Sequence, residues 1–156
     1  MIELDHLPAD AELMRQALEA AQVASSLNEV PVGAVIWHED SIVACRHNEK
    51  ETSGDPTAHA EILALRDAAD KIGSWRLSGA VVAVTLEPCC MCAGALQQAR
   101  VSRVVYGAAD PKGGALGSLY NFAVDPRLNH EFEVVHGILG DESSKLLKDF
   151  FCRLRV

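Results

Sequence analysis

The chain has 156 residues, 49% of them hydrophobic and 23% charged, and it carries a formal net charge of −8. A chain of this length and composition forms one ordinary globular domain, which we expect to span residues 1–156, and neither a disordered chain nor a repeat array fits it. The acidic balance argues against broad electrostatic binding to phosphate backbones, so any contact with nucleic acid has to be a local patch.

The first half of the sequence predicts a helix, a hairpin and a second helix. Apolar residues recur at helical spacing from about Asp10 to Leu27, and Asp10 can cap the N-terminus of this helix. Two β-rich runs, VPVGAVIW and SIVAC, are separated by HED and predict a hairpin. The polar stretch 47–57 is then a loop, and we expect the second helix to begin at its cap Thr57 and to end at Gly73.

The second half predicts three more strands and two more helices. AVVAVTL is a continuous apolar run of the kind that is buried on both faces in a parallel sheet. CCMCAGALQQAR follows as a helix with Pro88 in its first turn, RVVYG and FEVVHGIL are strands, and DESSKLLKDFFCRLR is the closing helix. This order contains two βαβ units after a hairpin, so we expect an α/β fold with a mixed five-stranded sheet and helices on both faces.

The compartment can be inferred from the apolar pattern and from the N-terminus. No apolar run approaches the roughly 18 residues that a membrane-spanning helix needs. The start MIELDHLPAD is acidic, whereas a signal peptide is basic and then apolar. We therefore expect a cytoplasmic protein without membrane contact, whose five cysteines are reduced thiols or metal ligands.

The motifs HAE and PCCMC carry the residues for a metal site. Cys89 and Cys92 have the C-x-x-C spacing that lets two sulfurs meet one ion, but two thiolates leave tetrahedral zinc half empty. We expect the third ligand to be His59, because both motifs open helices at the same edge of the predicted sheet. Zinc with these three ligands keeps one position for water, which becomes a hydroxide near neutral pH. Glu61 can then move the proton of that water to the substrate.

Two other interpretations of the cysteines remain open at this point. A C-x-x-C pair after a strand is also typical of thioredoxin-like redox dithiols. Cys90 could instead be the fourth ligand of a closed structural zinc site. Adjacent helical residues project about 100° apart, so we do not expect Cys90 to reach the same ion as Cys89 and Cys92. A closed site would also give Glu61 no role.

The combination of H-x-E with P-C-x-x-C resembles the zinc-dependent deaminases of the cytidine deaminase superfamily. The segments EVPVGAV, DPTAHAEILAL, TLEPCCMCAGAL, RVVYGAADPKGGALGS and LLKDFF extend the similarity over nearly the whole chain, to bacterial tRNA-specific adenosine deaminases. The resemblance implies a three-layer αβα fold, one zinc ion per subunit and a homodimer. It also implies hydrolytic deamination of the wobble adenosine in a tRNA anticodon to inosine, with attack at C6 of the flipped-out adenine.

The resemblance further implies which residues bind the substrate. In chain order these are Glu29 and Val30 in the pocket wall, Asn48 against base and ribose, the Ala60 N–H at the purine edge, Leu86 and Glu87 at the border of the site, Asp110 beside the nucleotide, and Lys112, Arg153 and Arg155 on the RNA-contacting surface. The chain departs from the family at Cys152, where a basic residue commonly follows the paired phenylalanines.

Two further functions share part of this pattern. A deaminase of free guanine, cytosine or a nucleotide would use the same zinc machinery. A zinc-stabilised RNA-binding protein without activity would keep the ligands, although an intact Glu61 speaks against it. The acidic balance is compatible with a tRNA substrate if recognition rests mainly on splayed anticodon bases held in pockets.

Overall fold

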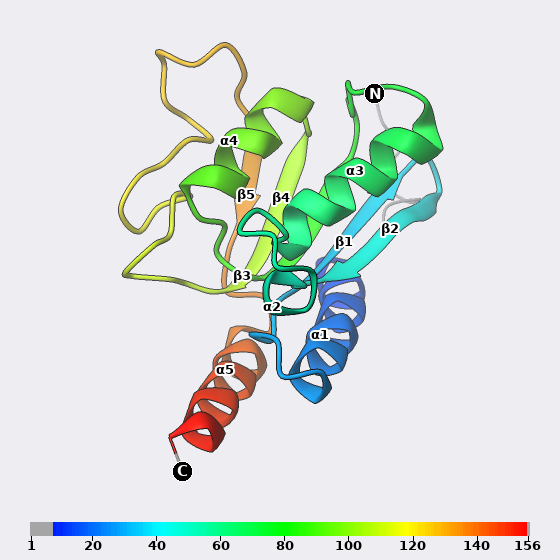
Figure 1. The fold of residues 1–156 in the computed structure, drawn as a ribbon. Helices are drawn as coiled ribbons and strands as arrows, with labels where there is room; N and C mark the ends of the chain where they lie inside the picture. Colours follow the sequence, from blue (N-terminus) through cyan, green and yellow to red (C-terminus); the bar gives the residue numbers. More distant parts are fainter. Residues whose placement is uncertain (1–7, 156) are drawn as a thin grey trace.

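A five-stranded sheet lies between two layers of helices in the computed structural model, which describes residues 8–155 (Figure 1). Most of the acidic N-terminal segment that lacks the signal-peptide pattern, residues 1–7, lies outside this range. The helices are α1 (Asp10–Ser26), α2 (Lys50–Ser53), α3 (Ala60–Ile72), α4 (Cys90–Ala99) and α5 (Gly140–Leu154). The strands are β1 (Gly33–His38), β2 (Ser41–His47), β3 (Val81–Leu86), β4 (Arg103–Ala108) and β5 (Glu133–Val135).

The sheet has the strand order β2-β1-β3-β4-β5 and is mixed, as the sequence predicts. β1 pairs antiparallel with both β2 and β3, whereas β3, β4 and β5 run parallel to one another. Because β1 runs against its neighbours, its first residues lie at the same edge as the carboxyl ends of β2, β3 and β4. The chain leaves the sheet toward α3, α4 and the loop after β4 from this one edge, which is where ligands bind in such folds.

Both faces of the sheet are covered by helices. α1 and α5 pack on one face, where Leu13, Met14 and Ala17 of α1 contact Val35 and Val105. α3 and α4 pack on the other face, over a larger core that includes the alternate residues of β1, β3 and β4. The three-layer αβα arrangement is therefore the predicted one. None of the described helices is long and apolar enough to cross a membrane.

α1 lies unusually close to β1 because Gly33 has no side chain. A Cβ atom at this position would lie 1.9 Å from the carbonyl oxygen of Ala17, well inside van der Waals contact. The glycine of VPVGAV is thus a close-packing position between helix and strand.

In the first half α1 begins at Asp10 as predicted, but both predicted N-cap residues, Asp10 and Thr57, are wrong. The N-cap of α1 is Ala9, and the carboxylate of Asp10 instead pairs with Arg103 of β4. α3 begins at Ala60, because the N–H and hydroxyl of Thr57 both bond to the side chain of Asp55 at 2.8 and 2.7 Å and hold residues 55–57 in a turn. The expected loop 47–57 also contains the one-turn helix α2.

Two predictions in the second half are also corrected. Pro88 precedes the N-cap Cys89 and lies outside α4, where its carbonyl accepts a hydrogen bond from Ala115. β5 is confined to residues 133–135, because Gly137 and Leu139 adopt positive φ angles of 77° and 51° that end the extended run. The remaining strands and helices lie where the sequence predicts them, within a few residues.

Candidate active site

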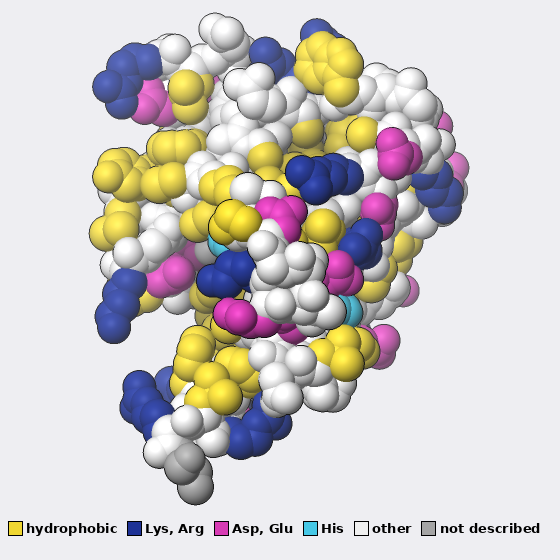
Figure 2. Space-filling model, in the orientation of Figure 1, with side chains coloured by type: hydrophobic (Ala, Val, Ile, Leu, Met, Phe, Trp, Pro, Cys, Tyr) yellow, Lys and Arg dark blue, Asp and Glu magenta, His cyan; other side chains and the backbone are white. Residues whose placement is uncertain are grey.

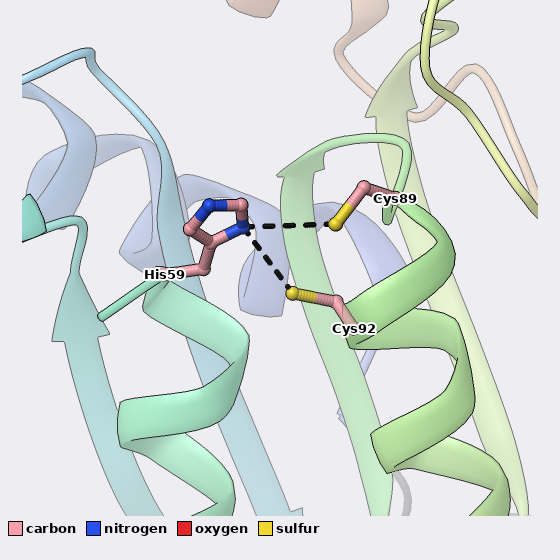
Figure 3. A group of neighbouring side chains, drawn as sticks. All are labelled: His59, Cys89 and Cys92. Carbon is pink, nitrogen blue, oxygen red and sulfur yellow. Dashed lines mark hydrogen bonds between the residues drawn. The ribbon is translucent and has the colours of Figure 1, made fainter. Parts of the chain in front are cut away.

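His59, Cys89 and Cys92 converge at the edge of the sheet where α3 and α4 begin. His59 is the N-cap residue of α3, Cys89 is the N-cap residue of α4, and Cys92 lies in the first turn of α4. Their side chains point toward one another across the gap between the two helix starts (Figure 3). The Nδ1 atom of His59 lies 3.7 Å from the sulfur of Cys89 and 3.5 Å from that of Cys92.

These separations suit a tetrahedral zinc ion. With Zn–S bonds of about 2.3 Å and Zn–N bonds of about 2.0 Å, neighbouring nitrogen and sulfur ligands should lie roughly 3.5 Å apart. All three ligand atoms also lie within 4.8 Å of one another. Both sulfurs approach the same ring nitrogen of His59, which has a single lone pair and suits one ion better than two hydrogen bonds. The residues present therefore fit zinc, with a fourth position left open.

The two thiols of the cluster differ in acidity. A hydrogen bond from Cys92 lowers the pKa of Cys89 to about 3, and His59 acts in the same direction. The hydrogen bond to Cys89, burial and the nearby Glu61 raise the pKa of Cys92. The lowered pKa favours the thiolate form of Cys89, which is the form that binds a metal ion.

Glu61 lies directly beside this cluster. It occupies the first turn of α3, is only 4% exposed, and its Oε2 accepts a hydrogen bond from the Cys92 sulfur at 3.2 Å. Burial raises the pKa of this carboxyl above its ordinary value. Within a helix, residues i and i+2 point in nearly opposite directions. His59 and Glu61 can face the same site because His59 is the N-cap residue and lies before the first helical residue of α3.

Cys90 does not belong to the cluster. It is exposed at the first position of α4, and the group of residues 8–155 whose atoms could together hold a metal ion is His59, Cys89 and Cys92. The arrangement offers no fourth cysteine ligand, so it does not favour the closed structural site.

A cavity of about 190 Å³ opens over Glu61 and the cluster. It is smaller than the roughly 300–1,000 Å³ of pockets that hold drug-sized ligands, and it suits a single planar base. Its lining residues come from all the segments at this edge of the sheet: Val30, Val32, Asn48, Lys50, His59, Ala60, Glu61, Leu86, Glu87, Cys89 and Asp110. Val32 and Lys50 were missed by sequence reasoning, although Lys50 follows Asn48 closely enough to have been considered.

Six of the ten substrate-binding residues implied by the resemblance line this cavity: Val30, Asn48, Ala60, Leu86, Glu87 and Asp110. Asn48 spans the wall, since its amide donates to the Val30 carbonyl at 3.3 Å and accepts from the Lys50 N–H at 3.2 Å. The N–H of Ala60 lies at the start of α3, where helical N–H groups have no acceptor within the helix.

Glu29 lies behind the cavity rather than in its lining. Its side chain is fully buried, and its carboxylate accepts hydrogen bonds from the N–H groups of Glu51 and Thr52 and from the Thr52 hydroxyl. These bonds hold α2, which has few other contacts of its own. Glu29 therefore supports the wall that carries Asn48 and Lys50.

The three basic residues implied for RNA binding lie outside the cavity. Lys112 is exposed next to Asp110, and Arg155 is exposed at the end of α5. Arg153 donates to the Ser25 carbonyl at 3.0 Å and lies 5.4 Å from the ring of Phe150, so it also joins α5 to α1. Figure 2 shows dark blue basic side chains on both sides of the lower end of the molecule, where α5 projects.

The fold and this cluster define a deaminase of the cytidine deaminase-like class, and the pattern of the MafB19-like deaminase family matches residues 9–155. A tRNA-specific adenosine deaminase from Bacillus subtilis is 47% identical over 94% of this chain and 91% of its own length. One from Haemophilus influenzae is 46% identical over 94% of this chain and 85% of its own length. With such identity over almost the full length, the chain belongs to the family of tRNA-specific adenosine deaminases.

Solved structures agree with this assignment. A structure from work on A-to-I editing by tRNA:A34 deaminases at the wobble position of transfer RNA superposes with a TM-score of 0.84 at 43% identity, covering 87% of this chain and 99% of that one. A guanine deaminase from Nitrosomonas europaea superposes with a TM-score of 0.81 at 25% identity, covering 94% of this chain and 86% of that one. The fold is thus common to enzymes that act on RNA and on a free base.

Proposed function

We propose that this chain, as one deaminase domain over residues 1–156, converts the wobble adenosine of a tRNA anticodon to inosine. The observation that carries the proposal is the buried carboxylate of Glu61 beside a metal-competent cluster, at the base of a cavity that suits one purine. The near full-length relatives are tRNA-specific adenosine deaminases, which supports adenosine in tRNA as the substrate. The net reaction adds water at C6 of adenine, breaks the bond from C6 to the exocyclic nitrogen and releases ammonia.

The metal ligands would be His59, Cys89 and Cys92, with one zinc ion per subunit. When bound there, zinc would supply Lewis acidity that makes water a stronger nucleophile at neutral pH. Glu61 takes the proton released by the attacking water and delivers it to the departing nitrogen, which is general acid and base catalysis by one group. Its burial keeps bulk water from competing for that proton.

The cavity residues would bind and orient the base. Val30 and Leu86 supply apolar contact with the flat faces of the purine, and the N–H of Ala60 donates to its edge. Asn48 would contact the base and the ribose, and Asp110 would lie beside the nucleotide, since both residues line the cavity. A single-stranded anticodon loop can present a splayed base to such a pocket, whereas a duplex first has to unpair and unstack it.

The RNA outside the pocket would contact Lys112, Arg153 and Arg155, the basic residues that the resemblance implies for this role and that lie outside the cavity lining. The chain is acidic and these are few basic contacts, so we expect the affinity for RNA to fall only moderately as the salt concentration rises. We propose a cytoplasmic location, where the tRNA substrate is found. Cys152 stands where the family commonly has a basic residue, so Arg153 and Arg155 replace that charge only in part.

We further propose a homodimer. α3 and α4 leave an apolar groove of about 630 Å³ between them on the outer face, beside Trp75, whose side chain is 62% exposed. Its lining is apolar except for two residues: Ile62, Leu65, Arg66, Ala69, Trp75, Leu77, Ala95, Gln98 and Ala99. Exposed apolar surface of this kind is typical of subunit interfaces, and a second copy of the chain would cover it.

A single experiment tests the substrate. The zinc-loaded protein is incubated with an anticodon stem-loop that carries adenosine at the wobble position, with the same stem-loop carrying guanosine there, and with free adenine, guanine and cytosine. We expect inosine in the first RNA and no conversion of the others. Turnover of a free base without inosine in the RNA would overturn the proposal.

The alternative is a deaminase of a free base such as guanine. The similarity to the guanine deaminase of Nitrosomonas europaea favours it, since that protein covers 94% of this chain. The small cavity would accept guanine as readily as adenine by size alone. The same incubation separates the two functions, because only a free-base deaminase turns over guanine without RNA.

A further inference from the structure

Glu87 is a buried charged residue that the proposed chemistry does not use. It follows β3 at the edge of the sheet, directly before the turn that carries Cys89, and it is only 2% exposed. Although Glu87 borders the cavity, a carboxylate this deeply buried must be hydrogen-bonded within the protein. Its bonding partners therefore decide what it can do.

All of those partners belong to the loop that follows β4. Oε1 accepts from the N–H of Asp110 at 3.1 Å and from the hydroxyl of Ser118 at 2.5 Å. Oε2 accepts from the N–H groups of Leu116 and Ser118, both at 3.1 Å. Both oxygens are occupied by donors of the segment 110–118, so the carboxylate is turned toward the loop and away from a ligand in the cavity.

The loop closes around this carboxylate at Gly114. A Cβ atom at Gly114 would lie 2.2 Å from the carboxyl carbon of Glu87, so only glycine lets the backbone pass so close. The next residue, Ala115, donates its N–H to the carbonyl of Pro88 at 2.8 Å, and Gly114 forms a bridge with Cys89. The same loop is thus bonded on one side to the turn that carries a metal ligand.

The loop begins with Asp110, an acidic residue that also lines the cavity. The backbone N–H of Asp110 bonds to Glu87, and its own carboxylate accepts from the N–H groups of Lys112 and Gly113 at 3.1 and 3.2 Å. Segment 110–118 has no regular secondary structure of its own. Besides the bonds at Gly114 and Ala115, four hydrogen bonds to Glu87 hold its conformation near the cavity.

We infer that Glu87 is a positioning residue that anchors loop 110–118 as one wall of the nucleotide pocket, rather than a residue that contacts the substrate. This inference rests on the proposed function for the identity of the nucleotide, but the anchoring itself rests only on the hydrogen bonds. Removing the anchor should weaken the binding of the RNA substrate and leave the chemistry at Glu61 largely intact. A residue in direct contact with the reacting base would instead lower kcat.

The test compares Glu87→Gln with Glu131→Gln, which makes the same change at an exposed site. An amide offers one acceptor oxygen where the carboxylate offers two, so two of the four hydrogen bonds that the loop donates to Glu87 are lost. We expect the KM for the wobble-adenosine stem-loop to rise about tenfold in Glu87→Gln, with kcat within about threefold of the original and zinc content unchanged. Hydrogen exchange should accelerate in residues 110–118 and stay unchanged in β1 and β3.

Gly114→Ala should also disturb the contact between Glu87 and the loop, here by a change in the loop. Since its methyl group displaces the Glu87 carboxylate, we expect it to reproduce the higher KM, and the double variant should be no worse than the more severe single one. Ser118→Ala removes one of the bonds and should fold in any case, with a smaller KM increase of about threefold and faster exchange in the same segment.

The outcomes separate this inference from the proposed function. Unchanged exchange in 110–118 together with an unchanged KM in Glu87→Gln or Ser118→Ala would overturn the anchoring role. A Glu87→Gln protein that loses zinc and exchange protection throughout the chain would also overturn the anchoring role, since Glu87 would then support the fold as a whole. If the original protein forms no inosine in RNA, the proposed function fails, and the exchange data alone still confirm or refute the anchor.

Discussion

Replacing Glu61 with glutamine tests the proton transfer without changing the shape of the site. Glutamine has nearly the same volume, so the cavity and the packing of α3 should persist. The three ligand atoms lie close together without help from Glu61, because the contacts of His59 join it directly to Cys89 and Cys92. The Glu61→Gln variant should therefore fold and bind one zinc ion per chain.

The expected loss of rate follows from the burial of Glu61. General acid and base catalysis contributes about 10²–10⁴-fold in enzymes, or roughly 3–5 kcal/mol at about 1.4 kcal/mol per factor of ten. Glu61 is 4% exposed, so solvent water cannot replace it as a proton carrier. We therefore expect the upper part of this range, a kcat lower by about 10³-fold or more, which corresponds to about 4 kcal/mol.

The assay measures inosine formation in the stem-loop under single-turnover conditions, together with zinc content by elemental analysis. Glu12→Gln on the exposed side of α1 is the matched control and should retain full activity. A Glu61→Gln protein that binds zinc and deaminates within about tenfold of the original would refute the role of Glu61 as proton carrier. A variant that loses zinc would show that Glu61 supports the metal site instead.

The remaining predictions concern the metal, the dimer and the packing. His59→Ala should lose zinc and activity, whereas Cys90→Ser should keep both, and elemental analysis of the two proteins checks this. Trp75→Glu should shift the protein to a mass near 16.8 kDa in light scattering, and an unchanged dimer would place the interface elsewhere. Gly33→Ala should lower the free energy of unfolding by about 3 kcal/mol and Tm by roughly 10 °C, because its Cβ meets the Ala17 backbone at 1.9 Å.

Much of the fold could be predicted because strand and helix patterns are local. The alternation and apolar runs that predict β1 to β4 reflect burial on one or both faces of the sheet, and Gly73 ends α3 in the left-handed conformation that glycine favours. α2 could not be predicted, since it is held by the carboxylate of Glu29, which comes from a segment more than twenty residues away. Long-range bonds of this kind leave no trace in local sequence.

The metal cluster was predictable and the pocket walls were less so. His59, Cys89 and Cys92 have spacings that place them at two helix starts, and topology alone brings these starts to one edge. The true start of α3 depends on the Asp55 turn, which moves the N-cap from Thr57 to His59. Sequence similarity placed Glu29 and Glu87 at the pocket, but only the structure shows that their carboxylates bind backbone N–H groups, of helix α2 for Glu29 and of the loop after β4 for Glu87.

A zinc titration of the metal-free protein tests the central claim most directly. Inosine formation in the wobble-adenosine stem-loop is followed as zinc is added in increments, and the bound metal is measured in the same samples. We expect activity to rise in proportion to bound zinc and to level off at one ion per chain. Full activity without zinc, or one bound zinc per chain without inosine, would contradict the account.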